Sequence, residues 1–145
     1  MVKIVVSSQA PGGLDAWVDP RFARCPVYTI IDVSDGMIKL ADVVQNTSAE
    51  SPRGAGIQAA QVVANLGAKV IIAGNMGPNA LASLKQLGIK VLAAPLGVTI
   101  KDVVQKYLEG ALAEITSPTA PGMGGGQGMG RGLGRGGGRG RGRQR

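Results

Sequence analysis

The segment RFARCP, residues 21 to 26, places two arginines beside the only cysteine of the 145-residue chain. Arg21 and Arg24 can hold an anion through charge and N–H donation, and a thiolate at Cys25 could bind a soft metal. Neighbouring positive charge lowers the pKa of a thiol, so we expect thiolate character at Cys25. The alternative is that Cys25 is a small buried residue and that the arginines pair with Asp15, Asp19 or Asp32.

The loop that carries these residues runs from Gln9 to Pro26 and is longer than the ~4 to 6 residues of a usual connection. Loops of more than ~12 residues in a compact domain are commonly functional or disordered. We expect this one to be ordered, because Trp17 and Phe22 can anchor it to the domain while the prolines restrict its backbone.

Two glycine-rich segments, RGAGIQAA (53–60) and AGNMGPNA (73–80), each lead into a helical pattern. The first fits the dinucleotide-binding pattern G-x-G-x-x-A, but no strand precedes it and no acid stands about 20 residues later. A helix that begins there, with exposed N–H groups and Arg53 beside it, can still bind an anion. The second segment adds the thioether of Met76. The alternative for both is that glycine only serves the turn into the helix.

Hydrophobic patterning predicts strands at 3–8, 27–33, 37–44, 69–74 and 89–94, and helices at 54–67, at 78–88 and from Thr99 onward. A hairpin turn at 34–36 joins the second and third strands, and Thr99 with Asp102 resembles a capping box. The order β-β-β-α-β-α-β-α predicts an α/β fold with a mixed five-stranded sheet and flanking helices. Because ligands bind α/β sheets at the carboxyl ends of strands, loops 9–26, 45–56 and 74–79 should face one crevice.

Charge and glycine are concentrated at the end of the chain. Residues 1–117 carry 10 Lys and Arg against 9 Asp and Glu, whereas residues 118–145 hold six arginines, no acid and 13 of the 24 glycines. Such a segment cannot bury enough apolar surface to offset the entropy of ordering it. We therefore predict one folded domain, residues 1–117, and a disordered Gly/Arg/Met-rich tail, residues 118–145.

The absence of some residue types excludes many classes of enzyme. The chain has no histidine, which excludes the triads and zinc sites that need an imidazole, and one cysteine, which excludes an intramolecular disulfide. No apolar run is long enough for a signal peptide or a bilayer span, so a cytoplasmic protein without membrane contact is expected. A nuclease needs clustered carboxylates, but Asp15, Asp19 and Asp32 are spread over loop and strand. We predict no catalysis, and binding of a preassembled anionic species instead.

Three longer stretches occur in order within residues 1–113: VDPRFARCPVYTIIDV, GAGIQAAQVVANLGAKVIIAGNMGPNALASLKQLGIKV and TIKDVVQKYLEGAL. Together they resemble the dinitrogenase iron-molybdenum cofactor-binding family, whose NifX-like domain also ends NifB-type proteins and occurs in small stand-alone proteins. The resemblance implies a ribonuclease-H-like fold with sheet order 3-2-1-4-5. Nitrogenase members of the family bind iron-molybdenum cofactor or its precursors and pass them on during assembly. One stand-alone relative carries a mixed molybdenum-copper sulfide cluster without strong covalent ligation.

The resemblance also implies which residues bind the cluster, with Cys25 as the metal ligand: Arg21, Phe22, Arg24, Cys25, Gly54, Gly56, Gly74, Asn75, Met76 and Gly77. The chain departs from the family pattern at two points. Ala23 stands where the family commonly has glycine, which narrows the backbone conformations open to the loop. The missing histidine favours a generic metal-sulfide cluster, or an unknown anion, over iron-molybdenum cofactor itself.

The predicted function is therefore that of a carrier for an anionic metal-sulfide cluster or its precursor, of iron-molybdenum or molybdenum-copper type. It would deliver the cluster to an acceptor protein, as a monomer or as a homodimer that shares the cluster. The alternative is a nucleic-acid-associated protein whose arginine-rich tail contacts phosphates. The tail could instead be a flexible accessory, or help to capture a cluster through Met123, Met129 and its arginines.

Overall fold

The structure is a computed structural model that describes residues 2–49, 54–95 and 97–119. Its elements follow the predicted order: β1 (Val2–Ser8), β2 (Val27–Ser34), β3 (Met37–Gln45), α1 (Ala55–Asn65), β4 (Val70–Ala73), α2 (Pro78–Gln86), β5 (Lys90–Ala93) and α3 (Ile100–Leu108). The predicted disorder of the tail concerns residues that, apart from Pro118 and Thr119, lie outside the described ranges.

The five strands form one mixed sheet in the order β3-β2-β1-β4-β5, which confirms the predicted topology. β1 pairs antiparallel with β2, β2 pairs antiparallel with β3, and β4 lies parallel to both β1 and β5. The hairpin turn is where it was predicted, with positive φ at Asp35 (56°) and Gly36 (73°). These dihedrals are those of a type I′ turn, whose twist matches that of the flanking strands.

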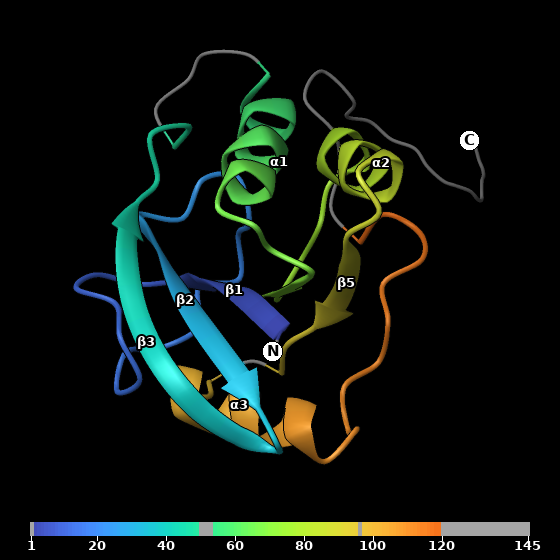
Figure 1. Cartoon of the computed structure of the whole chain (residues 1–145). Coiled ribbons are helices and arrows are strands. Elements are labelled where there is room, and N and C mark those ends of the chain that lie inside the picture. The colour runs from blue at the N-terminus through green and yellow to red at the C-terminus, as the bar shows by residue number, and fades with distance from the viewer. Residues whose placement is uncertain (1, 50–53, 96, 120–145) are drawn as a thin grey trace, which may run out of the picture.

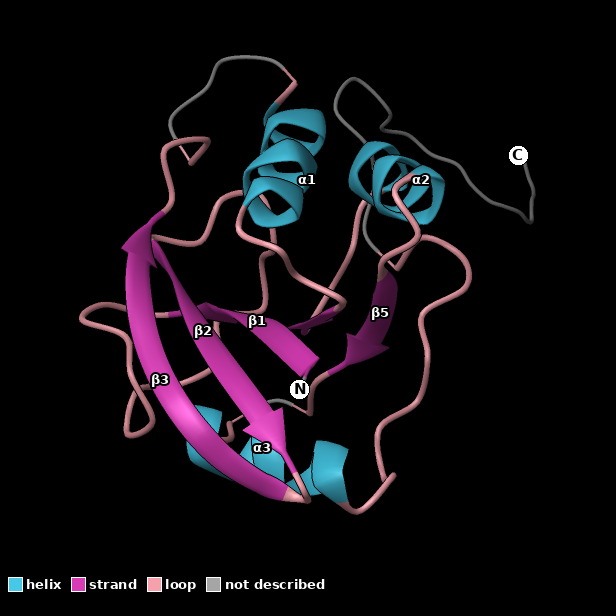
Figure 2. Cartoon of the chain, in the orientation of Figure 1, coloured by secondary structure: helices cyan, strands magenta, loops and turns pink. Residues whose placement is uncertain are grey.

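Helices cover both faces of the sheet. Figures 1 and 2 show α1 and α2 side by side on one face and α3 on the other. Each face has its own apolar cluster, one under α1 and α2 and one under α3. The central strands β1 and β4 contribute to both clusters, which explains their continuous apolar runs, whereas the edge strand β3 is mostly exposed.

The chain returns from α3 to the other face along the outer edge of β5. Ala93 donates its N–H to the carbonyl of Ala113 at 2.8 Å, and Ile115 donates to Val91 at 2.9 Å. The side chain of Ile115 is buried in the cluster under α1 and α2. Figure 1 shows this segment, in orange, running past β5 toward α2. Its last described residue, Thr119, is hydrogen-bonded to Met76.

No helix within the described ranges is long and apolar enough to cross a membrane.

Candidate anion-binding pocket

A cavity of about 410 Å³ lies where three loops of the predicted crevice meet. It is lined by residues 20–24, by residues 54–56 at the start of α1, and by Asn75 with residues 77–80 at the start of α2. The structure therefore brings together seven of the ten residues implied by the resemblance: Arg21, Phe22, Arg24, Gly54, Gly56, Asn75 and Gly77. The other three, Cys25, Gly74 and Met76, are not part of the lining.

The start of α1, which lines the pocket, has backbone donors that are paired with no described residue. The first helical hydrogen bond runs from the N–H of Gln58 to the carbonyl of Gly54, at 2.9 Å. The N–H groups of Ala55, Gly56 and Ile57 come before it and have no partner within the helix. The N-cap is Gly54, no described side chain caps the helix, and no acid stands in the first turn. Among the described residues, no side chain neutralises the partial positive charge of this helix end, which favours an anion.

The start of α2 likewise has backbone N–H groups that precede the first hydrogen bond of the helix. Its first helical bond runs from Leu81 to the carbonyl of Gly77, at 3.1 Å, so the N–H groups of Asn79 and Ala80 precede it. Pro78 occupies the first helical position and has no N–H to satisfy. Within the described part of the chain no side chain caps this end either, and its first turn contains no acid.

A close approach of Gly56 to Ala80 joins the two helix ends. A Cβ on Gly56 would lie 3.0 Å from the backbone nitrogen of Ala80 and 3.2 Å from its Cβ. The missing side chain therefore lets α1 and α2 converge, which concentrates two positive helix ends at one wall of the pocket.

Arg21 is held by a buried carboxylate. Asp19, which is 2% exposed, accepts bonds from the Arg21 backbone N–H and Nε at Oδ1, at 2.8 and 3.0 Å. It accepts a third from Nη2 at Oδ2, at 2.8 Å. These bonds raise the pKa of Arg21, and Nη1 takes no part in the pair. The alternative in which an arginine pairs with Asp19 is thus realised for Arg21, which nevertheless lines the pocket.

Three polar side chains, which the sequence did not single out, contact the backbone of residues 20–25, called the arginine loop from here on. Asn46 donates from Nδ2 to the carbonyls of Ala23 and Cys25, at 2.9 and 2.7 Å. The hydroxyl oxygen of Ser48 lies 3.1 Å from the same carbonyl of Ala23, and the hydroxyl of Tyr28 donates to the carbonyl of Phe22 at 2.9 Å. Because these buried side chains bind its carbonyl groups, the backbone of the loop is held in one position beside the pocket. The one signal in the sequence was the polar run NTS directly after the third strand.

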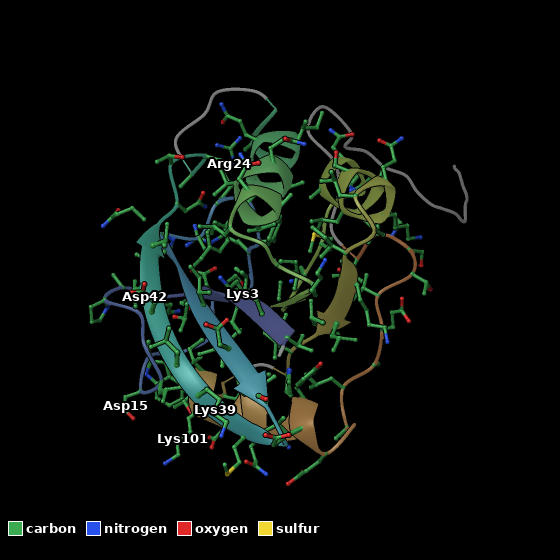
Figure 3. All side chains as sticks on the ribbon, in the orientation of Figure 1. Lys3, Asp15, Arg24, Lys39, Asp42 and Lys101 are labelled. Atoms are coloured by element: carbon green, nitrogen blue, oxygen red, sulfur yellow. The ribbon has the colours of Figure 1, made fainter. Side chains whose placement is uncertain are left out.

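Arg24 connects this loop to the turn that follows β3. Its Nη1 donates to the carbonyl of Ala49 at 3.1 Å. Figure 3 shows Arg24 beside α1, at the end of the molecule opposite Lys39 and Lys101. Arg53, which the sequence also placed near this site, lies outside the described residues.

Cys25 is a core residue in this structure. Its side chain is 0% exposed, and its Sγ lies 3.3 Å from the carbonyl oxygens of both Phe22 and Val27, either of which can accept its single hydrogen. Burial raises the pKa of Cys25 to about 12. This runs against the expected thiolate character, since the loss of hydration raises the pKa of the thiol most and the charge of Asp19 raises it further. The structure matches the alternative of a small buried residue.

Cys25→Ala is expected to leave anion binding in the pocket unchanged while lowering the free energy of unfolding by about 1–2 kcal/mol through the cavity it creates. Tetrathiomolybdate titration and urea unfolding measure the two effects. A loss of binding by tenfold or more, with the fold intact, would make Cys25 a ligand after all.

The structure also places four further residues on which the sequence raised expectations. Phe22 is buried and anchors the loop as predicted, but Trp17 is 52% exposed, so the prediction that it anchors the loop is wrong. Trp17 contributes through its backbone, by a bridge to Thr99. Met76 is fully buried. Gly74 packs against Pro20, where a Cβ would lie 2.7 Å from the proline Cα.

Within the described ranges, no three His, Cys, Asp or Glu side chains gather where they could hold a metal ion. The donors at the pocket are backbone N–H groups and arginines, which bind anions. Fold and pocket together thus define an α/β domain with a pocket whose donors suit a small anion, between two helix ends and the arginine loop.

Comparison with known proteins identifies the family. The model of the family described as dinitrogenase iron-molybdenum cofactor matches residues 2–110, and the chain belongs to this family. An uncharacterised protein of Methanocaldococcus jannaschii is 36% identical over 95 residues, which cover 66% of this chain and 80% of the relative.

Two solved structures agree in sequence as well as fold. The apo form of the orange protein from Desulfovibrio gigas is 38% identical, with a TM-score of 0.76, over 83% of this chain and 98% of that one. A putative NifB protein from Thermotoga is 32% identical, with a TM-score of 0.69 and the same coverage of both chains.

Proposed function

We propose that this protein binds an anionic metal-sulfide cluster, or a precursor of one, in the pocket and carries it to an acceptor protein without catalysing a reaction. The observation that carries the proposal is that two helix N-termini, which no described side chain caps, converge with Arg21 and Arg24 around one cavity. The family description, which names the iron-molybdenum cofactor, supports a metal cluster as the anion.

The chemistry of the pocket suits a cluster that arrives complete. Thiometallates such as tetrathiomolybdate carry their own sulfide ligands and a net negative charge, so a protein can hold them with N–H donors alone. The described residues supply such donors and no grouped metal ligands. An iron-molybdenum or molybdenum-copper sulfide cluster meets this description, and so does a simpler thiomolybdate precursor.

Noncovalent binding also fits a carrier, which must release its cargo. A helix end typically contributes about 0.3–1 kcal/mol to the binding of an anion, and an arginine adds a charge-assisted hydrogen bond. The sum of several such contacts holds an anion reversibly, with no metal–protein bond to break at transfer. The pocket opens to solvent beside the exposed side chain of Arg21, which gives an acceptor access to the cargo.

Replacing both pocket arginines, as Arg21→Gln with Arg24→Gln, is expected to weaken tetrathiomolybdate binding by about 10- to 100-fold. The protein is purified without air and titrated with tetrathiomolybdate, alone and with copper or iron. Charge-transfer absorption in the visible range reports the bound anion.

The matched control is Lys39→Gln with Lys101→Gln, which removes the same charge at the far end of the molecule (Figure 3). We expect its affinity to stay within about twofold of the original, since distant exposed charges are screened by salt. Equal losses in the two double variants would refute a local site. Metal and sulfide analysis of the protein isolated from its own host identifies the cluster.

The nucleic-acid alternative depends on arginines 131–145, which the structure does not describe. It stays a prediction.

A further inference from the structure

One wall of the pocket joins β4 to the start of α2 and is held from two sides. Asn75 and Gly77 line the pocket, and Met76 stands between them with its side chain fully buried. On one side, the N–H of Asn75 donates to the carbonyl of Pro20 in the arginine loop, at 2.7 Å. On the other side, the backbone of Met76 is bonded to Thr119, which lies 43 positions later in the sequence.

The two bonds between Thr119 and Met76 hold both peptide groups of Met76. Oγ1 of Thr119 accepts from the Met76 N–H at 2.8 Å, and this N–H belongs to the peptide group that joins Met76 to Asn75. The N–H of Thr119 donates to the Met76 carbonyl at 2.9 Å, in the peptide group that leads to Gly77. The hydroxyl and the backbone of Thr119 thus orient the connections to two residues of the lining.

The start of α2 follows directly from this held segment. Gly77 is the N-cap of α2, in an extended conformation with φ of −77° and ψ of 168°. Asn79 and Ala80, whose N–H groups precede the first helical bond, come next in the pocket lining. No described side chain caps this helix end. The direction of its N–H donors therefore depends on the backbone that enters the helix.

Thr119 reaches this place through a segment that has anchors of its own. The strap, residues 113–119, is paired with the outer edge of β5 by backbone bonds at Ala113 and Ile115. The side chain of Ile115 is buried in the core, and Lys85 of α2 donates from Nζ to the carbonyl of Thr116. These contacts do not involve the side chain of Thr119, so a change there should leave the strap in position.

We propose that Thr119 is a positioning residue for the anion site, which holds residues 75–77 and the start of α2 in the orientation that binds the anion. This role rests on the anion binding proposed above. Thr119 is not part of the pocket lining and acts through Met76. Hydrogen bonds weaken steeply as the donor turns away from the acceptor, so a small rotation of these peptide groups lowers the affinity.

Thr119→Val tests the hydroxyl, because valine keeps the shape of the side chain and the backbone bond but cannot accept from the Met76 N–H. In the full chain, purified without air, we expect the Kd for tetrathiomolybdate to rise by about three- to tenfold. Thr119→Ser keeps the hydroxyl and should bind within about twofold of the original chain. Since Thr119 is exposed, the midpoint of urea unfolding should hardly change in either variant.

Hydrogen exchange of the Met76 amide, measured without the anion, reports the bond itself. It should be about three- to tenfold faster in Thr119→Val and near the original rate in Thr119→Ser. The matched control is Thr116→Val, which makes the same chemical change at another exposed position of the strap. We expect this control to alter neither the Kd by more than about twofold nor the exchange of Met76.

The possible results separate the positioning role from the proposed function. If Thr119→Val binds tetrathiomolybdate as tightly as the original chain while Arg21→Gln with Arg24→Gln binds weakly, the positioning role is overturned and the proposed function stands. Faster exchange at Met76 with an unchanged Kd also overturns it, because the bond would then not shape the site. So does a serine variant as weak as the valine variant, or an equal loss in Thr116→Val. No tetrathiomolybdate binding by the original chain overturns both proposals.

Discussion

Asn46→Ala is expected to lower the free energy of unfolding by about 3 kcal/mol, because several buried hydrogen bonds depend on this one side chain. The amide nitrogen serves the carbonyls of Ala23 and Cys25. The amide oxygen accepts from the N–H and the hydroxyl of Ser48, at 3.0 and 2.6 Å. Alanine removes both ends of this network and leaves buried polar groups without partners. Urea unfolding followed by circular dichroism measures the loss.

Asn46→Ala should also weaken anion binding, because Asn46 supports the position of Arg24 through a chain of hydrogen bonds. The bond from Ser48 to Asn46 closes the turn that ends at Ala49, and the carbonyl of Ala49 accepts from Arg24. Without Asn46, both the loop that carries the arginines and the turn that restrains Arg24 lose their fixed positions. We expect a tetrathiomolybdate affinity reduced by about tenfold under conditions where the variant is still folded.

Asn65→Ala is the matched control, since Asn65 is exposed at the end of α1. The same chemical change there should alter stability by less than about 0.5 kcal/mol and leave binding unchanged. If Asn46→Ala proves as mild as this control, the polar network does not hold the loop.

The fold could be predicted because it depends on patterns that short stretches of sequence carry. The continuous apolar runs of β1 and β4 mark strands covered on both sides, and the Ser34-Asp35-Gly36 turn fixes β2 and β3 as a hairpin. The two crossovers then force parallel pairing. The location of the pocket followed in turn, because loops at the carboxyl ends of strands meet at one edge of the sheet.

The directions of side chains within the loops could not be predicted in this way. Helices and strands have a period that tells inward from outward positions, but the loop from 9 to 26 has none. Cys25 and Trp17 were therefore assigned by residue type, and the structure buries the first beside Tyr28 and exposes the second. Asn46 and Ser48 act through contacts to residues more than twenty positions away, which a single sequence does not reveal.

The contact of Gly74 with Pro20 joins the end of β4 to the arginine loop. The N–H of Asn75 donates to the carbonyl of Pro20 at 2.7 Å, and this bond requires Pro20 to lie almost against Gly74. A Cβ on Gly74 would come within 2.7 Å of the Pro20 Cα and within 3.2 Å of its carbonyl oxygen. Since these are backbone atoms, no change of side-chain rotamer can relieve the overlap.

Gly74→Ala is therefore expected to push the loop from Pro20 to Arg24 away from β4 and to lower the free energy of unfolding by about 3 kcal/mol. Gly110→Ala makes the same chemical change where no atom lies within 4 Å, at a φ of 72°. It should cost only the left-handed strain of about 1–2 kcal/mol. The displaced loop should also weaken tetrathiomolybdate binding in Gly74→Ala, whereas Gly110→Ala keeps its affinity. Equal effects of the two variants on binding would show that the contact with Pro20 does not position the pocket arginines.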